Sequence, residues 1–215
     1  MKPLKTELQD AETLRDLGSA SVQIVHDLKN QLNGLKLYAT FLRKRMEKAE
    51  RPADEQETLA KLISGLERAA ADMTVLVRFG RALELRRQPG TDLARLLQDS
   101  AEGAHVECDG GPFEGDFDPV LLAEALKNIT AGALGESGAA QDDGGAKRVR
   151  LSGDGAGALV EWQGAAATAE GEDPFRSLVG ASGLRMALAA KIVRAHGGEV
   201  SSEAGRIRAR LPLQK

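Results

Sequence analysis

The sequence predicts an α+β protein whose first half is helical and whose second half mixes helices with strands. Only four of the 24 glycines lie before residue 89, and the other twenty follow it. No proline interrupts the stretch between Pro3 and Pro52, which leaves room for a long helix. Near the C-terminus, arginines alternate with Ile207, Ala209 and Leu211, as in a half-buried strand. We therefore expect two domains, a helical hairpin over residues 1–88 and an α/β domain over residues 89–215.

Composition narrows the class of protein. The chain has 215 residues, a single cysteine (Cys108) and a formal net charge of −3. No intramolecular disulfide can form, and no general attraction to nucleic acid or anionic lipid is expected. No stretch approaches the roughly twenty apolar residues of a membrane span, and the N-terminus lacks the apolar core of a secretory signal. We expect a cytoplasmic protein that binds neither nucleic acid nor membrane.

The first helix is expected from Thr6 to about Glu47. Thr6 and Gln9 have the spacing of a capping box. Two neighbouring rows of apolar residues follow at helical intervals. They comprise Leu14, Leu17, Ile24, Leu28, Leu35 and Leu42 in one row, and Val25, Leu32, Ala39 and Met46 in the other. A stripe of this length needs a partner along it.

A second helix is expected to start at Asp54, which forms a capping box with Glu57, and to end at Pro89. Its apolar face comprises Leu59, Leu62, Ile63, Leu66, Ala70, Met73, Leu76, Val77 and Leu83. Since a lone hairpin covers each stripe on one side only, we predict a homodimer in which two hairpins form a four-helix bundle. An antiparallel coiled coil folded on the second domain, without a dimer, is the alternative that periodicity leaves open.

One flank of the first helix carries residues suited to phosphoryl chemistry. His26 lies roughly 130° around the helix from the midline of the apolar stripe, so we expect it to face solvent. Lys29 and Asn30 share that side. Neutral imidazole is a nucleophile near pH 7 and can carry a phosphoryl group on one nitrogen while the other donates its proton. Asp27 is the nearest candidate acceptor for that proton.

The His-Asp-Leu-Lys-Asn run that begins at His26, within residues 21–33, resembles the H-box of two-component sensor histidine kinases. In that family a bundle histidine takes phosphate from ATP and passes it to an aspartate on a response regulator. The resemblance implies that His26 is the phosphoacceptor and Asp27 its orienting acid. It also implies that Asn30 is the position that, in some members, helps water attack the regulator's phosphoaspartate. The usual proline is Gln31 here, so a helix kink is expected to be weak or absent. An ordinary surface histidine is the competing interpretation.

Helices and strands alternate in the second half. Asp118 followed by Pro119 predicts a helix that ends near Gly135. Ser182 predicts another helix, which stops at the Gly197-Gly198 pair. Strands are expected at residues 148–151, 159–162 and 206–211. Helices on one face of a mixed sheet fit this pattern.

The order of these elements resembles the catalytic and ATP-binding domain of histidine kinases, a fold shared with gyrase-type ATPases. The most specific part is the segment 191–198, followed by a short strand pair that ends at Leu211-Pro212. Together with the H-box, the resemblance spans nearly the whole chain, in the domain order of a kinase core without a sensor.

The departures from that family lie where ATP binds. Asn128 matches the first residue of the asparagine box, but the second asparagine, which holds magnesium, corresponds to Gly132. The aspartate that reads adenine corresponds to Trp162, whose indole has one donor and no acceptor.

The last glycine-rich box departs as well. Gly183 is retained, but Ala181 and Arg185 stand at two positions where glycine lets main-chain N–H groups approach phosphate. Only residues 163–182 separate Trp162 from Gly183, so the lid between the boxes is short. We expect weak or no ATP binding, and hence no cofactor.

The function we infer from these features is histidine phosphotransfer in a two-component phosphorelay. His26 would pass phosphate between the aspartates of response-regulator receiver domains, supported by Lys29 and by magnesium supplied by the receiver. The expected docking groove comprises Leu28, Leu32, Leu35, Met73 and Leu76. No metal site is expected, since the remaining histidines (His105 and His196) and Cys108 lack ligand-like spacing.

Two alternatives stay open. One is a divergent ATP-dependent histidine kinase core. The other is a non-catalytic regulator that binds a kinase or a response regulator.

Overall fold

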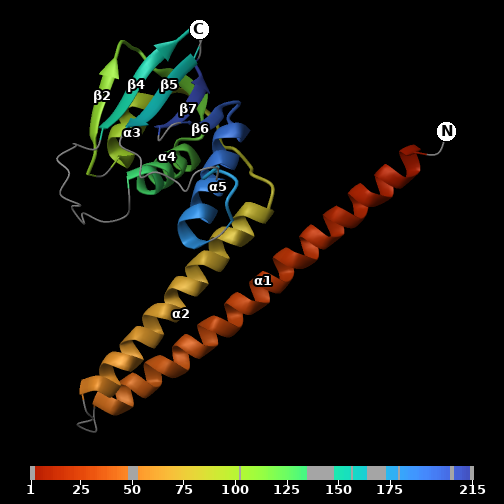
Figure 1. The fold of residues 1–215 in the computed structure, drawn as a ribbon, viewed down its shortest axis with the longest axis vertical. Coiled ribbons are helices and arrows are strands. Elements are labelled where there is room, and N and C mark those ends of the chain that lie inside the picture. Colours follow the sequence, from red (N-terminus) through yellow and green to blue (C-terminus); the bar gives the residue numbers. More distant parts are fainter. Residues whose placement is uncertain are drawn as a thin grey trace. The chain divides into compact units, whose positions relative to one another are not determined.

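The computed structural model forms two compact units, residues 1–82 and 83–215 (Figure 1). The residues that it describes are 3–47, 53–101, 103–134, 148–155, 157–163, 173–178, 180–203 and 206–213. The α+β class predicted from the sequence is confirmed. The expected boundary after residue 88 lies further along the chain than the observed one, because the second helix ends earlier than predicted.

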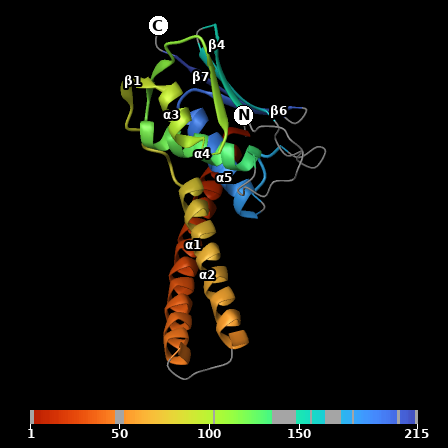
Figure 2. The ribbon, with the colours of Figure 1, turned by 90° about the vertical axis from the view of Figure 1, so that its left-hand side faces the viewer.

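The first unit is a hairpin of two long helices, α1 (Pro3–Glu47) and α2 (Ala53–Gly80) (Figure 2). α1 begins at Pro3 rather than Thr6, and proline is well suited to a first helical turn because that turn's N–H groups lack partners inside the helix. α2 begins within one residue of the expected start. Its expected end is wrong: the helix stops at Gly80, a poor helix former, and Leu83 lies outside it.

A buried seam joins the two helices. Ala39 of α1 packs with Leu59 and Ile63 of α2, and Met46 and Leu66 extend this cluster. Lys36 Nζ lies 2.8 Å from Glu67 Oε1 on one side of the seam. This ion pair shows which residues of the two helices lie at the same level.

The second unit is built on a five-stranded sheet with the strand order β2-β4-β5-β7-β6. Its elements are β1 (Gln88–Asp92), α3 (Leu93–Ser100), β2 (His105–Asp109), β3 (Glu114–Phe117), α4 (Pro119–Leu134), β4 (Arg148–Asp154), β5 (Gly157–Gln163), α5 (Gly180–Ala195), β6 (Glu199–Glu203) and β7 (Arg206–Pro212). β2 pairs with β4 in parallel, the other pairs of this sheet are antiparallel, and β1 pairs with β3 in a separate ribbon. The predicted mixed sheet is therefore confirmed.

The predicted elements of this unit are present, and several were missed. The strands at 148–151, 159–162 and 206–211 run one to three residues further, and α5 begins at Gly180 rather than Ser182. The expected strand pair after the Gly197-Gly198 turn consists of β6 and β7. Elements β1, α3, β2 and β3 were not predicted.

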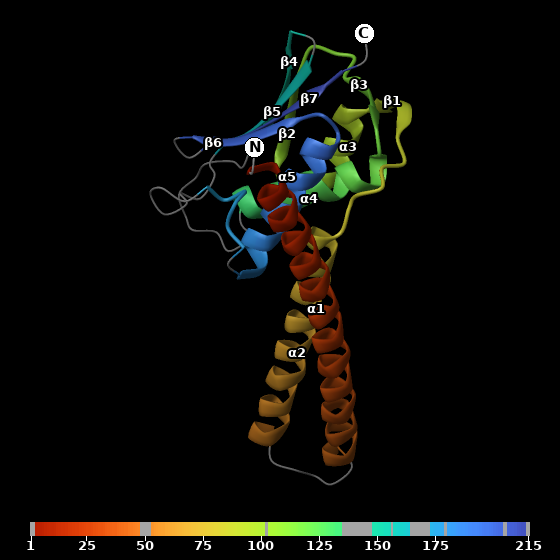
Figure 3. The same cartoon turned by 90° about the vertical axis from the view of Figure 1, so that its right-hand side faces the viewer.

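The three helices of this unit cover one face of the five-stranded sheet (Figure 3). Alternate residues of the strands point into the core between them, as the burial pattern of β5 and β7 shows. The fully buried side chains of this core include Leu122, Leu126, Ile129, Leu151, Trp162, Leu188, Ile192 and Leu211.

The other face of the sheet carries charged side chains in cross-strand pairs. Arg150 Nε on β4 donates to Asp109 Oδ2 on β2 over 2.6 Å, and Arg208 Nε on β7 donates to Glu161 Oε2 on β5 over 2.8 Å. The hydrogen bond from Arg208 holds the pKa of Glu161 below its ordinary value, against the effect of burial. This face is polar and its charges largely neutralise one another.

Candidate functional site

His26 lies on the exposed flank of α1, as predicted. Its side chain is 45% exposed. The position of His26 is about 140° around the helix from Ala39, which lies in the buried seam. The neighbouring Val25 is half-buried, so the seam continues at this level while the imidazole stays outside it.

The Nδ1 atom of His26 faces two competing side chains. Asp27 Oδ1 lies 3.5 Å from it, and Asn30 Nδ2 also lies 3.5 Å from it. Both contacts are at the long end for hydrogen bonds. The Asp27 carboxylate can accept a hydrogen bond from a protonated Nδ1, whereas the Asn30 amide can donate one to an unprotonated Nδ1. The carboxylate therefore favours the tautomer whose Nε2 is the nucleophile, and the amide favours the opposite one.

Lys29 lies next to the cluster of His26, Asp27 and Asn30 and is not part of it. The contacts recorded for the His26 ring come from Asp27 and Asn30. Lys29 lies about 60° around the helix from His26, towards the seam, and is half-buried. α1 continues through Gln31 without interruption.

The asparagine-box positions lie on α4. Asn128 and Gly132 are four residues apart and share one face of the helix. A Cβ atom on Gly132 would lie 2.4 Å from Sδ and 2.8 Å from Cγ of Met186, a buried residue of α5. Met186 therefore occupies the space into which an asparagine side chain at position 132 would begin to extend.

Trp162, at the position of the adenine-reading aspartate, is part of the core. It lies near the end of β5 and is fully buried, and its Nε1 donates to Oγ1 of Thr130 on α4 over 2.9 Å. Thr130 is itself buried, with 4% of its surface exposed. The single donor of the indole is thus already used, and its rings fill the space between sheet and helix.

The last glycine-rich position is closely packed. A Cβ on Gly183 would lie 3.0 Å from the backbone oxygen of Ser177 and 3.1 Å from its hydroxyl oxygen. Arg185 is half-exposed on the same helix, and Ala181 is half-buried. Of the short lid between Trp162 and Gly183, residues 164–172 and 179 lie outside the described residues.

At the two positions that the resemblance assigns to adenine and magnesium, the side chains do not fit ATP with its magnesium ion. Position 162 offers no carboxylate to the adenine amine, and position 132 offers no oxygen to a magnesium ion. The side chains of Trp162 and Met186 stand where those groups would be needed. Met186, Thr130 and Ser177 were missed in the sequence analysis, because each matters through a contact with a distant part of the chain.

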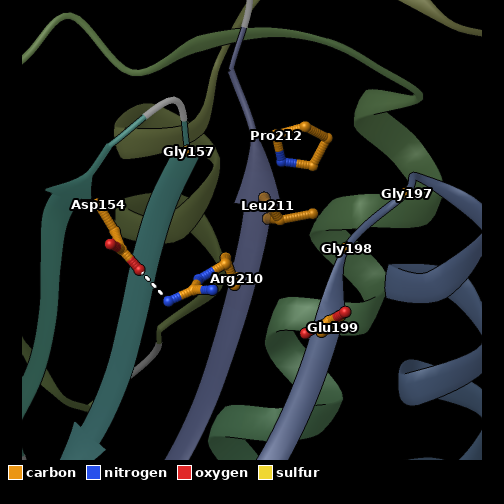
Figure 4. A pocket seen from close by; sticks show the side chains of 8 residues that line it. All are labelled: Asp154, Gly157, Gly197, Gly198, Glu199, Arg210, Leu211 and Pro212. Atoms are coloured by element: carbon orange, nitrogen blue, oxygen red, sulfur yellow. Dashed lines mark ion pairs between the residues drawn. The ribbon is translucent and has the colours of Figure 1, made fainter.

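A separate pocket of about 300 Å³ lies at the end of β7. Figure 4 shows Arg210 and Asp154 as an ion pair across β5, beside the Gly197-Gly198 turn and Glu199. Because two carboxylates accompany the guanidinium, this pocket has no excess positive charge for an anion. Its lining includes none of the six positions aligned with the ATP boxes.

Within the described part of the chain, no three His, Cys, Asp or Glu side chains converge as metal ligands would. Of the described helices, none combines the length and apolarity that a bilayer crossing requires.

The His196 imidazole is structural, as its spacing indicated. Its ring is buried, its Nδ1 donates to the Ile192 carbonyl oxygen over 2.8 Å, and its Nε2 accepts from the Asp118 N–H over 3.0 Å. Asp118 in turn caps α4 by accepting from the N–H groups of Val120 and Leu121. This network joins the end of α5 to the start of α4.

Known structures share this architecture. Full-length ShkA in complex with AMPPNP matches with a TM-score of 0.63 and 19% identity, over 88% of this chain and 44% of that one. Histidine kinase ThkA in complex with response regulator protein TrrA matches with a TM-score of 0.62 and 15% identity, over 98% of this chain and 66% of that one. The chain has the fold of a histidine kinase core. The Acinetobacter baumannii histidine kinase AdeS also shares this core, with a TM-score of 0.53 and 13% identity over 84% of this chain and 96% of that one.

The likeness is confined to structure. No protein-family model matches the sequence, and no curated protein sequence matches it. The histidine kinase core resemblance stated from the H-box and the segment 191–198 is confirmed at the level of the fold. The chain spans less than half the length of ShkA.

Proposed function

We propose that this protein is a histidine phosphotransferase in which His26 accepts a phosphoryl group from one receiver aspartate and passes it to another, without ATP. The observation that carries the proposal is a contrast between the two units. His26 is exposed, with an acid and an amide at its Nδ1, whereas the adenine-reading position is a buried tryptophan that is already hydrogen-bonded.

The transfer step needs only groups that the two partners supply. Nε2 of neutral His26 attacks phosphorus, the bond from phosphorus to the receiver's aspartyl oxygen breaks, and the carboxylate leaves. The imidazole becomes cationic, with its proton on Nδ1, and the Asp27 carboxylate stabilises that charge. The reverse reaction on a second receiver restores neutral His26. Magnesium belongs to the receiver.

Response-regulator receivers are the partners that fit this chemistry. ThkA, which shares the fold, was solved in complex with its response regulator TrrA. Leu37 lies three turns from His26 on the same stripe of α1 and is 55% exposed. We assign receiver docking to this stripe. The groove expected from the sequence does not suit that role, because Leu28 and Leu35 lie roughly 160° or more from His26, on the far side of α1.

We propose that a second copy of the chain packs against the exposed leucines of the hairpin. Leu28, Leu35 and Leu42 repeat every seven residues and are 42%, 54% and 55% exposed. On α2, Leu62 and Leu76 are 54% and 36% exposed. These leucines are displaced from the seam in one rotational sense on both helices. Lys36 and Glu67 are displaced from the seam in the other rotational sense, and their charged atoms are in contact. In an antiparallel hairpin the exposed leucines of both helices therefore lie together on the opposite side of the seam. Two such faces would form a four-helix bundle with His26 outside.

A divergent ATP-dependent kinase core is the second candidate, because the fold is shared with ShkA, which was solved with AMPPNP. Calorimetric titration with ATP and magnesium, together with incubation in radiolabelled ATP, separates the two. We expect no heat of binding and no labelling. Labelling of His26 by ATP that disappears in His26→Ala would establish the kinase and overturn our proposal.

Phosphotransfer itself is tested with a phosphorylated receiver domain. We expect phosphate to appear on the wild-type protein and not on His26→Ala, with both proteins equally folded by circular dichroism. If no receiver phosphorylates His26 and His26→Ala binds its partners normally, the protein is a non-catalytic regulator.

A further inference from the structure

We propose that Arg78 of α2 is a catalytic residue of the phosphotransfer site, where its guanidinium contacts the phosphoryl group that His26 receives. This inference rests on the proposed function and adds a residue from the second helix to a site so far built from α1 alone.

The level follows from the ion pair between Lys36 and Glu67, whose charged atoms are 2.8 Å apart. His26 lies ten residues before Lys36, and Arg78 lies eleven residues after Glu67. In antiparallel helices both steps run in the same direction, by about 15 Å and about 16.5 Å at 1.5 Å per residue. His26 and Arg78 therefore lie at nearly the same height. Val77, the neighbour of Arg78, is 9% exposed, so α2 still contributes to the seam at this height.

The side follows from the helical repeat. Eleven residues make three turns and about 20°, so Arg78 lies on the same face of α2 as Glu67. On α1, His26 lies about 80° beyond Lys36, rotated away from the seam in the same sense. Since Lys36 and Glu67 meet on one side of the seam, His26 and Arg78 both lie on that side. It is the side opposite the exposed leucines.

The chemistry suits a transferring phosphoryl group. Negative charge in the transition state is spread over three equatorial oxygens, and a planar guanidinium can donate two parallel hydrogen bonds to two of them. Axes of packed helices are about 8–10 Å apart, a gap that the long arginine side chain can span towards a group on His26. Arg78 is half-exposed in the last turn of α2, where the helix dipole also favours a cation. With Lys29 on α1, each helix then supplies one positive charge.

Phosphoramidate is a suitable probe, because it phosphorylates histidine with loss of ammonia: its P–N bond breaks as the bond from phosphorus to Nε2 of His26 forms. The full-length protein is incubated with excess phosphoramidate, and phosphohistidine is followed by phosphorus NMR. We expect Arg78→Gln to slow labelling by about ten-fold or more and Arg78→Lys to restore part of the rate. Arg68→Gln is the matched control, since Arg68 lies ten residues earlier on α2 and faces away from the seam. It should stay within about two-fold of wild type.

The outcomes are distinguishable. A rate for Arg78→Gln within two-fold of wild type, with the same helix content and molar mass, would overturn the role of Arg78 alone. An equal loss in Arg68→Gln would do the same, because the effect would then reflect net charge. Failure of wild-type His26 to be labelled by phosphoramidate or by a phosphorylated receiver would overturn the proposed function, and the role of Arg78 with it.

Discussion

The indole N–H of Trp162 donates a hydrogen bond to the hydroxyl of Thr130 over 2.9 Å, inside the core of the second unit. The bond ties β5 to α4 at the point where, in the resembled family, an aspartate reads adenine. The side chain at this position therefore holds two elements of secondary structure together.

Replacing Trp162 should therefore act on stability. We expect Trp162→Phe to lower the free energy of unfolding by about 1–3 kcal/mol, because a buried hydroxyl loses its partner and a smaller ring leaves a void. Thr130→Val alone should cost less. The double variant should cost less than the sum of the two single changes, since the bond is lost only once. Urea unfolding followed by far-ultraviolet circular dichroism measures this, and strict additivity would show that the bond contributes nothing.

Any side chain at position 132 should lower the stability of the protein. A Cβ at this position would lie 2.4 Å from the Met186 sulfur, so we expect Gly132→Ala to destabilise by about 1–3 kcal/mol despite the better helix propensity of alanine. Gly34 is also helical but has nothing within 4 Å of a built Cβ, so Gly34→Ala should stabilise by roughly 0.5–1 kcal/mol. Thermal unfolding of both variants tests the contrast. Equal effects of the same sign would contradict it.

Restoring the aligned asparagine should not restore magnesium ATP binding. In Gly132→Asn the new side chain begins inside the volume of Met186, and Trp162 remains in place. We expect no calorimetric signal with ATP, even for a variant that stays folded. Tight binding by this single variant would mean that the packing of α4 against α5 is not what keeps nucleotide out.

Stability should depend on pH through His196. Burial lowers the pKa of His196 below its ordinary value of 6.5, with Arg87 acting in the same direction and the Ile192 carbonyl and Asp118 opposing it. The unfolded chain takes up this proton near pH 6.5, and the folded protein takes it up only at lower pH. The contribution of His196 to stability is therefore fully present above about pH 6.5. It is lost as the pH falls from there towards the pKa of His196 in the folded protein.

His196→Gln should remove that slope, whereas His105→Gln should leave it unchanged because His105 is exposed. Urea midpoints between pH 7 and pH 5 provide the measurement. Asp118 affects stability at lower pH. Burial raises the pKa of its carboxyl, but hydrogen bonds from the backbone N–H groups of Leu121, Arg86 and Val120 lower it by more, so this pKa lies below its ordinary value of 3.8. Its contribution is present above that value and is lost as the pH falls through the folded pKa. An unchanged slope in His196→Gln would assign the pH dependence to other groups.

Two leucines two residues apart should have separate roles. Leu35 is 54% exposed on the face assigned to a second copy, and Leu37 is 55% exposed on the stripe of His26. We expect Leu35→Glu to halve the molar mass measured by light scattering and Leu37→Glu to leave it unchanged. Conversely, Leu37→Glu should slow transfer from a phosphorylated receiver by about ten-fold or more, with little effect on labelling by phosphoramidate. Monomers in both variants, or in neither, would contradict this division.

Asp27 and Asn30 should affect His26 in opposite directions. Because Asp27 favours the nucleophilic Nε2 tautomer, Asp27→Asn should slow labelling of His26 by phosphoramidate by roughly ten-fold. Asn30→Ala removes the competing donor and should leave the rate unchanged or raise it. The two proteins differ by small side chains on an exposed helix face, so circular dichroism should not separate them. A larger loss in Asn30→Ala than in Asp27→Asn would reverse these roles.

Local sequence signals account for much of the fold. The long helices, the Asp118-Pro119 helix start and the strand carrying Ile207, Ala209 and Leu211 all follow from spacing that is visible within one element. β2 and β3 were missed because both are short and polar, and the end of α2 was misplaced because Leu83 continues the apolar pattern into a segment that is not helical. Contacts between residues far apart in the sequence, such as Met186 with Gly132, produce no periodic pattern from which they could be predicted.

In the candidate site, too, neighbours within one helix were predictable from the sequence and a residue of another helix was not. His26, Asp27 and Asn30 are neighbours on one helix, so their proximity could be predicted from the helical repeat alone. Lys29 lies about 60° around the helix from His26, nearer the seam, and its part in the site stays a prediction. Arg78 belongs to another helix, and only the pairing of Lys36 with Glu67 reveals its level.

The glycines of the turn after α5 are explained by the geometry of the backbone. Gly197 has a φ of 81°, and a Cβ on Gly198 would lie 2.5 Å from the Arg210 carbonyl oxygen. Together with the buried His196, these glycines are explained by closing a helix and starting a strand. A sequence pattern built on such residues therefore detects the fold, and whether a protein with this fold binds ATP must be decided from other positions.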